Sequence, residues 1–206
     1  RVPPVVSEYF RGGADAEITL HANVRAFQQS FVNAEGATHF EAVDTSTTVL
    51  DHRIQLPWYI TPVGSLRTLY PKAEAVAAKV AGQFGTVMGL STLSGTPMEE
   101  VAQASSNSCW FQLYLCGGRE TALRGIARAK KAGFTALVLT IDTSVSGQRL
   151  VHARMKPLEA MRSWEGLTLQ QKLQSLRRII SLAPQMLPRL NWLLDFYADH
   201  GVMEFV

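Results

Sequence analysis

The chain has 206 residues, of which 47% are hydrophobic and 18% are charged. This composition is typical of a globular chain with a sizeable core, arranged as one domain or as one large domain with an insertion. The net charge of +3 is too small to indicate nucleic-acid binding, and the basic residues are spread along the chain. No apolar run approaches the roughly 18 residues of a membrane span, and the amino terminus lacks the layout of a signal peptide, so we expect a cytoplasmic protein.

The cysteines and histidines indicate no special chemistry. The two cysteines, Cys109 and Cys116, fall in one expected strand region and make no disulfide framework. Both are therefore expected to be buried, reduced thiols. The five histidines show no spacing typical of metal ligands, so no metal site is expected.

The chain begins with a helical pattern and continues into a repeat. Residues 7–29 look helical, with an interruption at Gly12 and Gly13, and the threonine-rich part of 36–56 predicts short strands at a barrel end. From residue 57, apolar segments alternate with helical patterns, which predicts right-handed βαβ units and a parallel sheet. The expected strands are 58–61, 86–91, 110–114 and 134–143. The last is an unbroken apolar run, typical of a strand buried on both faces.

Local signals place helices between these strands. Pro71 marks a helix start and Gly85 its end, while Thr96 with Glu99 forms a capping box that predicts a second start. Gly133 ends the third helix. The apolar faces of the first and third helices are marked by Val76, Val80 and Phe84, and by Leu123, Ile126 and Ala127.

Residues 150–206 do not continue the repeat. Thr168 and Gln171 form another capping box, and Pro184 is expected to stop the helix that they begin. That helix carries one apolar stripe, made of Leu169, Leu173, Leu176 and Ile180. We interpret the segment as an insertion over the strand ends, so the chain divides into residues 1–56, 57–149 and 150–206.

Hydrogen-bonding or loop-forming residues follow each expected strand. They are Pro62-Val63-Gly64, Ser91-Thr92, Gln112-Leu113-Tyr114 and Thr140-Ile141-Asp142. Parallel sheets bind ligands beyond the carboxyl ends of their strands, so these groups should converge on one site. Gln, Ser and Thr suit the edge of a planar heterocycle, whereas Tyr and Asp suit substrate binding and proton chemistry. Taken alone, Asp142 has a second interpretation as a turn or capping residue.

The chain has neither a GxGxxG motif nor a P-loop. Four other motifs stand out: Tyr9-Phe10-Arg11-Gly12-Gly13-Ala14, Gly89-Leu90-Ser91, Phe111-Gln112-Leu113-Tyr114 and Leu139-Thr140-Ile141-Asp142-Thr143. Together they resemble the FMN-dependent α-hydroxy acid oxidising enzymes, the family of glycolate oxidase and of lactate and mandelate dehydrogenases. The resemblance runs from about Tyr9 to Arg149. It implies a (β/α)8 barrel holding FMN at its carboxyl face, with a variable lid where residues 150–206 stand.

The resemblance assigns roles in catalysis and substrate binding. Tyr9 resembles the tyrosine that contacts the substrate carboxylate from outside the barrel, and Tyr114 resembles the active-site tyrosine beside the substrate. Asp142 resembles the carboxylate that holds the catalytic histidine and stabilises its protonated form. Arg149 resembles the arginine near the mouth of the site.

The resemblance also assigns the FMN contacts. The side chains that match the hydrogen-bond partners of the flavin ring are Ser91, Gln112 and Thr140. The loop whose backbone would approach the flavin is Pro62, Val63 and Gly64. Val63 stands where the family usually has Thr. Gly64 replaces a frequent Ala, and Leu93 replaces an aromatic residue common in short-chain oxidases, so a bulkier hydroxy acid is expected.

One part of the family pattern is missing from this sequence. The catalytic histidine of the family lies in an Asn-His-Gly-Gly-Arg motif on a later strand, after a lysine, and nothing similar occurs here. A full barrel needs ~250 residues, and four of its units are recognisable. We therefore expect an amino-terminal half-barrel completed by a carboxyl-terminal half, either a second chain or a continuation. The complete protein would oxidise a 2-hydroxy acid to a 2-oxo acid and form an oligomer.

Other interpretations are compatible with the residues. A half-barrel could serve as a non-catalytic binding or assembly subunit, although a scaffold has no use for Tyr9, Tyr114 and Asp142. The same flavin chemistry could act on a peptide or an amine. The apolar stripe, with nearby arginines, could contact the inner face of a membrane. The preferred interpretation is a lid packed on the barrel or on a partner, because the basic residues are too few for a polybasic anchor.

Overall fold

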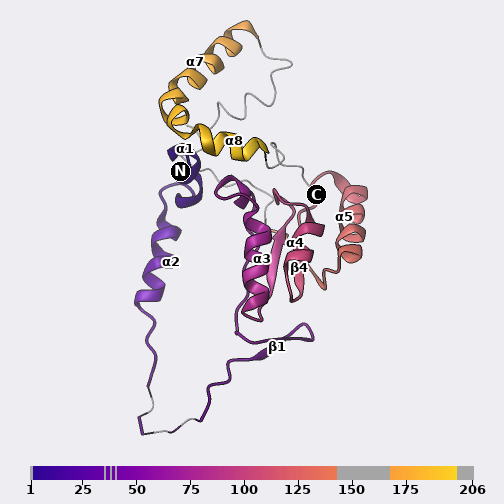
Figure 1. Ribbon diagram of the computed structural model, residues 1–206. Coiled ribbons are helices and arrows are strands. Elements are labelled where there is room, and N and C mark those ends of the chain that lie inside the picture. Colours follow the sequence, from indigo (N-terminus) through magenta and orange to yellow (C-terminus); the bar gives the residue numbers. More distant parts are fainter. Residues whose placement is uncertain (1, 35, 38, 40, 143–167, 199–206) are drawn as a thin grey trace. The chain divides into compact units, whose positions relative to one another are not determined.

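The computed structural model describes every residue except 1, 35, 38, 40, 143–167 and 199–206 (Figure 1). The chain divides into two compact units. The first, here called the sheet unit, comprises His39–Ser144 and Asp195–Val206. The second, here called the helical unit, comprises Arg1–Thr38 and Val145–Leu194.

The sheet unit contains strands that alternate with helices along the chain. Its parallel strands, in spatial order, are β3 (Met88–Ser91), β4 (Cys109–Leu113) and β5 (Ala136–Leu139). The helices that alternate with them are α3 (Ala73–Gln83), α4 (Met98–Ala104) and α5 (Gly118–Ala132) (Figure 1). The segment expected to be the first strand contributes one parallel bridge, from Ile60 to Met88. The expected α/β class with a parallel sheet is therefore confirmed.

The strand register separates the sheet into two chemically different faces. Leu90 pairs with Phe111, and both belong to the core cluster that includes the helix residues. Successive strand residues point to opposite faces, so the next pair, Ser91 with Gln112, lies on the face away from the helices. Val138 pairs with Gln112 on that same face. The polar strand-end side chains therefore share one side of the sheet.

Small residues form most of the contact of α3 and α5 with the core, whereas α4 contributes the larger Met98 and Val101. The buried small residues are Ala75, Ala78 and Ala81 of α3, and Ala122, Gly125 and Ala129 of α5. The predicted apolar faces of these helices are mainly exposed: 46% for Val76, 41% for Val80, 59% for Phe84 and 54% for Leu123. The prediction was therefore wrong for these four residues, because close approach selects small side chains, whereas Ile126 packs against the core as expected. A Cβ at Gly82 would lie 2.6 Å from the backbone nitrogen of Ser106, so α3 also lies close to the loop between α4 and β4.

Helix α4 begins without the expected capping box. Its N-cap is Pro97, which makes no side-chain capping hydrogen bond. The hydroxyl of Thr96 instead donates to Oε2 of Glu74 at 2.8 Å, and Glu99 pairs with Arg128 of α5. Both residues of the predicted box are therefore engaged by partners far away in sequence, and the local prediction was wrong.

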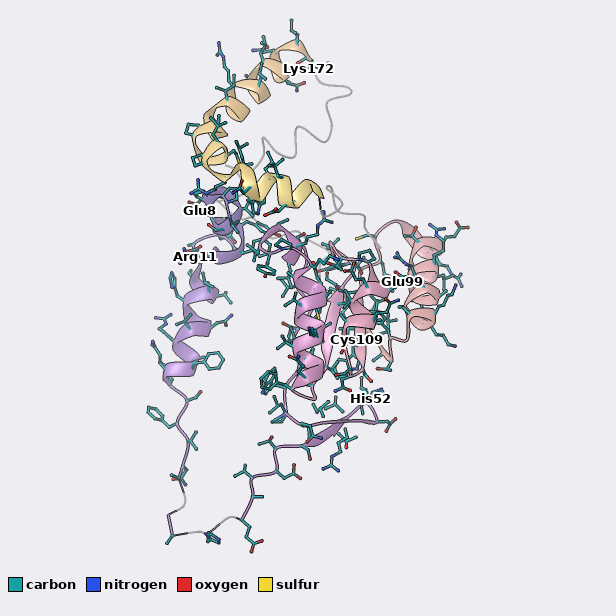
Figure 2. The ribbon with its side chains drawn as sticks, in the orientation of Figure 1. Glu8, Arg11, His52, Glu99, Cys109 and Lys172 are labelled. Carbon is teal, nitrogen blue, oxygen red and sulfur yellow. The ribbon has the colours of Figure 1, made fainter. Side chains whose placement is uncertain are left out.

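A β-hairpin lies beside the amino ends of the parallel strands. Its strands are β1 (Thr47–Val49) and β2 (His52–Ile54), within the segment expected to form short strands. Leu50 and Asp51 at the turn have φ of 48° and 63°, as in the mirror-image turns that match hairpin twist. Ile54 is buried in a core cluster with Val87, just before β3. Figure 2 shows His52 at this end of the unit.

Strand β5 is the outer strand of the sheet. Within the described residues, only β4 pairs with it. Leu137 is 46% exposed and Leu139 50%, and Ile141, just beyond the strand, is 84% exposed. The prediction that this strand is buried on both faces was therefore wrong for this structure, because a strand with one neighbour leaves an edge and part of a face uncovered.

The helical unit contains the first helices of the chain and most of its last described ones. Its elements are α1 (Pro4–Arg11), α2 (Ile18–Gln28), α7 (Leu169–Met186), η2 (Leu187–Arg189) and the first part of α8 (Leu190–Ala198). Gly12 ends α1, as expected. The capping box of Thr168 and Gln171 is confirmed at the start of α7. Pro184 lies inside α7, which continues to Met186, so the predicted stop was wrong by less than one turn.

The apolar stripe of α7 is exposed. The exposed fractions are 75% for Leu169, 53% for Leu173, 45% for Leu176 and 62% for Ile180. No helix in the described part of the chain is long and apolar enough to cross a membrane. A helix with one apolar stripe can pack that stripe against another apolar surface.

Candidate functional site

Three of the expected FMN contacts lie side by side at the carboxyl ends of adjacent strands. Ser91 at the end of β3 pairs with Gln112 of β4. The amide Nε2 of Gln112 donates to the hydroxyl of Thr140, just after β5, at 2.5 Å. Ser91 is 3% exposed and Gln112 4%. The structure therefore brings these polar groups together, as the strand pattern predicted.

The amide of Gln112 has a fixed orientation. Its Oε1 accepts a hydrogen bond from the backbone N–H of Thr92 at 3.3 Å, while its Nε2 donates to Thr140. An amide carries two N–H hydrogens and two acceptor lone pairs, so one donor and one acceptor are left for a ligand. Thr140 accepts from Gln112 and keeps its own hydroxyl hydrogen to donate. Such neighbouring donors and acceptors fit the polar edge of a flavin ring.

Thr92 organises the site, although the sequence did not single it out as a site residue. Its hydroxyl donates to the backbone oxygen of Gln112 at 2.6 Å and accepts from the backbone N–H of Tyr114 at 3.0 Å. Thr92 is 5% exposed. The only signal in the sequence was a second hydroxyl residue directly after β3. Its role depends on β4, which lies elsewhere in the sequence.

The loop at residues 62–65 lies against the end of β3. The backbone N–H of Ser65 donates to the oxygen of Leu93 at 2.9 Å. A Cβ at Gly89 would lie 2.9 Å from Cδ of Pro62, so the close approach requires a glycine in the strand. A Cβ at Gly64 would lie 3.1 Å from Cβ of Leu93. Leu93 therefore occupies part of the space that Gly64 leaves.

Tyr114 and Asp142 stand at the ends of β4 and β5. Tyr114 is half-buried, and its backbone is held by Thr92. Asp142 is exposed and makes no hydrogen bond or ion pair with other described residues. Its carboxylate can therefore accept hydrogen bonds from a group outside the described chain. The residues directly after Asp142 lie outside the described residues, so its second interpretation as a turn or capping residue stays open.

The structure does not test the other two expected substrate contacts, Tyr9 and Arg149. Tyr9 is a half-buried residue of α1 in the helical unit, and its ring packs edge-on against Phe10 with centroids 5.0 Å apart. Its role at the site stays a prediction. Arg149 lies outside the described residues, so its role also stays a prediction.

Glu99 and Cys109 are among the ionisable side chains of the sheet unit that have shifted pKa values. Arg128 donates to Glu99 through Nε and Nη2, at 2.7 and 2.8 Å, and these bonds hold the pKa of Glu99 below its ordinary value. Burial raises the pKa of the Cys109 thiol. Cys116 is exposed, so the expectation that both cysteines are buried was wrong for Cys116, which follows the end of β4. Figure 2 shows Glu99 and Cys109 in this unit.

A family model described as FMN-dependent dehydrogenase matches residues 1–190. The chain belongs to this family. The recognised family and the FMN cofactor are thus confirmed at the level of the family, whose members are oxidoreductases.

Curated relatives of this FMN-dependent dehydrogenase chain include plant oxidases. Glycolate oxidase of Spinacia oleracea is 30% identical over 173 residues, covering 82% of this chain and 47% of that protein. The peroxisomal (S)-2-hydroxyacid oxidase GLO3 of Arabidopsis thaliana is 30% identical over 167 residues, covering 81% of this chain and 46% of that protein. The chain therefore spans about half the length of the curated relatives that it matches.

Solved structures show the same relationship. Mandelate oxidase with (S)-4-hydroxymandelic acid superposes with a TM-score of 0.70 at 30% identity, covering 75% of this chain and 43% of that one. The monotopic membrane protein (S)-mandelate dehydrogenase superposes with a TM-score of 0.78 at 29% identity, covering 100% of this chain and 51% of that one. The likeness therefore includes the segment interpreted as a lid.

Proposed function

We propose that this chain contributes the first half of an FMN site and, completed by a second barrel half, oxidises a 2-hydroxy acid to a 2-oxo acid. The observation that carries the proposal is the buried amide of Gln112, held between Thr92 and Thr140 at three adjacent strand ends. Relatives named glycolate oxidase and mandelate oxidase support the substrate class.

The proposed FMN contacts follow from the unused hydrogen-bonding capacity of the strand ends. Ser91, Gln112 and Thr140 would bind the polar edge of the flavin ring. The backbone of residues 62–64 would approach the ring, because Gly89 lets this loop lie close to β3. When bound, FMN would accept the two electrons that the substrate loses.

Three residues are proposed to contact the substrate. Tyr9 and Arg149 would bind the substrate carboxylate, and Tyr114 would lie beside the substrate. Asp142 would accept a hydrogen bond from a histidine of the second half and stabilise the imidazolium formed when that histidine takes a proton. The exposed carboxylate, without a hydrogen bond to other described residues, supports this positioning role.

The requirement for a second half is supported by the open side of the sheet. Leu137 and Leu139 are exposed, and β5 pairs only with β4 among the described residues. Nε1 of Trp110 is buried and has no hydrogen-bond partner there. Buried N–H groups are nearly always bonded, so we assign its acceptor to the second half. In this arrangement residues 57–149 supply four β/α units, 1–56 the leading helix and hairpin, and 150–206 the lid.

The substrate is proposed to be an aromatic or long aliphatic hydroxy acid. Leu93 lies beside Gly64, and part of the space left by this glycine is filled by Leu93. The size argument therefore rests chiefly on Leu93, which is smaller than an aromatic side chain. Two of the similar solved structures are a mandelate oxidase and a mandelate dehydrogenase, which act on an aromatic hydroxy acid according to their names.

The exposed stripe of α7 supports a second proposal, concerning location. Leu169, Leu173, Leu176 and Ile180 all present at least 45% of their surface. The similar (S)-mandelate dehydrogenase is described as a monotopic membrane protein. We propose that α7 lies on a membrane surface, with a lid packed on a partner as the alternative.

The FMN proposal is tested on the full-length protein. We expect a yellow protein with a flavin spectrum that oxidises mandelate with a higher kcat/KM than glycolate. Gln112→Ala should weaken FMN binding by about ten-fold or more, since a held donor and acceptor are lost. Gln103→Ala, at an exposed position of α4, is the matched control and should bind FMN normally.

Three outcomes would contradict the proposal. A colourless protein that FMN does not reconstitute would overturn the cofactor assignment. Flavin binding without oxidation of any hydroxy acid would favour a binding subunit or an amine or peptide substrate. Glycolate as the best substrate would overturn the size argument.

A further inference from the structure

Two charged side chains are buried beside the site and have no role in the proposal above. Glu74, in the first turn of α3, is 0% exposed, and Arg67, in η1 (Leu66–Thr68), is 4% exposed. Burying an ionised group is costly unless hydrogen bonds compensate for its lost hydration. The bonds that these two residues make therefore identify what they hold in place.

The carboxylate of Glu74 accepts bonds from both neighbouring loops. Its Oε1 accepts from the backbone N–H of Gly95 at 3.1 Å and from that of Arg67 at 3.4 Å. Its Oε2 accepts from the hydroxyl of Thr96 at 2.8 Å. The amino end of a helix also favours a negative charge at this position. The carboxylate is thus matched by donors and by the helix dipole.

The guanidinium of Arg67 binds the backbone carbonyl of Gly95, the residue whose N–H binds Glu74. Its Nη1 donates to the backbone oxygen of Gly95 at 2.8 Å. Its Nη2 donates to the backbone oxygen of Phe196 at 3.2 Å, and the guanidinium carbon lies 5.2 Å from the centre of the Phe196 ring. Arg67 therefore joins the loop to a residue of α8 that belongs to the same compact unit.

Gly95 is consequently held at both its N–H and its carbonyl. A Cβ at this position would lie 2.8 Å from Cβ of Arg67, so a glycine is required for the close contact. Gly95 lies in the loop that joins β3 to α4. The same loop begins with the two residues that organise the strand ends, Ser91 and Thr92.

Hydrogen bonds connect the segment around Gly95 to the end of β3. The backbone oxygen of Ser91 accepts from the backbone N–H of Ser94 at 3.0 Å. The hydroxyl oxygen of Ser91 accepts from the backbone N–H of Leu93 at 3.1 Å. Leu93 in turn accepts from Ser65, next to the loop expected to approach the flavin. Both cofactor-facing loops are thus tied to one anchored segment.

We propose that Glu74 and Arg67 are positioning residues of the FMN site, which clamp Gly95 and thereby fix the loop carrying Ser91 and Thr92. This inference rests on the proposed function. In the structure all three partners of the Glu74 carboxylate donate to it. An amide at this position would turn an N–H group toward one of them.

The experiment uses the full-length protein. It distinguishes the effect of the Thr96 hydroxyl from the effect of the volume of its side chain. Thr96→Val removes the hydrogen bond to Glu74 with little change in volume, whereas Thr96→Ser keeps it. Glu74→Gln removes the charge directly. Glu99→Gln is the matched control. Glu99 lies in the first turn of α4, and the substitution removes the charge from its exposed pair with Arg128 of α5. Two quantities are measured: FMN dissociation constants, and hydrogen–deuterium exchange of residues 91–97 without FMN.

We expect Thr96→Val and Glu74→Gln to weaken FMN binding by about ten-fold and to accelerate exchange at residues 91–97. Thr96→Ser and Glu99→Gln should stay within about two-fold of wild type in both measurements. If Glu74→Gln does not fold, the two Thr96 variants decide the question.

The failures of the two proposals are distinguishable. Wild-type protein that does not bind FMN overturns the proposed function, and this inference with it. Wild-type protein that binds FMN, with unchanged dissociation constants in Thr96→Val, overturns the positioning role alone. Unchanged exchange at residues 91–97 in that variant shows that Glu74 does not hold the loop.

Discussion

Gln112 shows how one buried side chain can order several strand ends. Its amide spans the gap between the residue after β3 and the residue after β5, through Thr92 and Thr140. A buried amide left without these partners would cost about 1–3 kcal/mol per unsatisfied group. The same bonds that stabilise the sheet end therefore set the positions at which a flavin could be bound.

Asp142 provides the residue-scale test of the proposed chemistry. In the full-length protein, Asp142→Asn should lower kcat by about two orders of magnitude and change KM by less than about three-fold, because the lost charge stabilises the imidazolium formed during the reaction. Steady-state kinetics with the best hydroxy acid measures both constants. Asp51→Asn, in the hairpin turn, is the control and should leave kcat unchanged. Equal kcat values for Asp142→Asn and wild type would assign Asp142 a purely structural role.

Helices α4 and α5 are joined across their surfaces by Glu99 and Arg128. Both side chains are 44% exposed, so solvent screening limits what their two hydrogen bonds contribute to stability. The bonds lower the pKa of Glu99 from its ordinary value of 4.5. A group with a lowered folded-state pKa contributes stability above the unfolded value, and this contribution is lost as pH falls through the folded value.

The lowered pKa of Glu99 predicts how the stability of the variant Glu99→Gln depends on pH. At about pH 7 the free energy of unfolding of the variant should be lower than that of wild type by at most about 1 kcal/mol, and the difference should vanish at a pH low enough to protonate Glu99 in the folded protein. Urea unfolding at both pH values measures it. Glu120→Gln, which removes a longer and more exposed contact with Arg124, should match wild type throughout. A difference that grows on acidification would contradict the assignment.

At the scale of the molecule, β5 pairs only with β4 among the described residues, and the helical unit exposes an apolar stripe on α7. Apolar side chains with the exposures of Leu137 and Leu173 favour burial against another surface. The match to about half of each curated relative supports a second barrel half as the partner of β5. The stripe on α7 requires a different partner, for which a membrane surface is proposed.

Vesicle binding tests that assignment. Full-length protein should sediment with anionic vesicles at low salt, and the double variant Leu173→Glu with Leu176→Glu should stay in the supernatant, because charges oppose burial of the stripe in lipid. The control is Leu123→Glu, at an exposed leucine of α5, which should sediment as wild type does. Wild-type protein that remains soluble with these vesicles would show that the stripe packs on protein.

The sequence by itself determined the features that depend on neighbouring residues. The capping box of Thr168 and Gln171 forms between residues three positions apart, and the structure contains it. The three parallel strands after residue 85 were predicted because apolar runs and helix signals alternate within short segments. The family and its FMN cofactor were predicted from motifs along the first three quarters of the chain.

Only the tertiary structure decided the features that depend on distant partners. Thr96 was expected to cap α4, but Glu74, 22 residues earlier, binds its hydroxyl. Val76 and Val80 were expected to mark the packing face of α3, but the distance between helix and sheet selects the alanines. Thr92 acquires its role from β4, 20 residues later. In each case a local pattern fixes what a residue can do, and long-range packing decides which of those possibilities is realised, because the competing partner is brought close only by the fold.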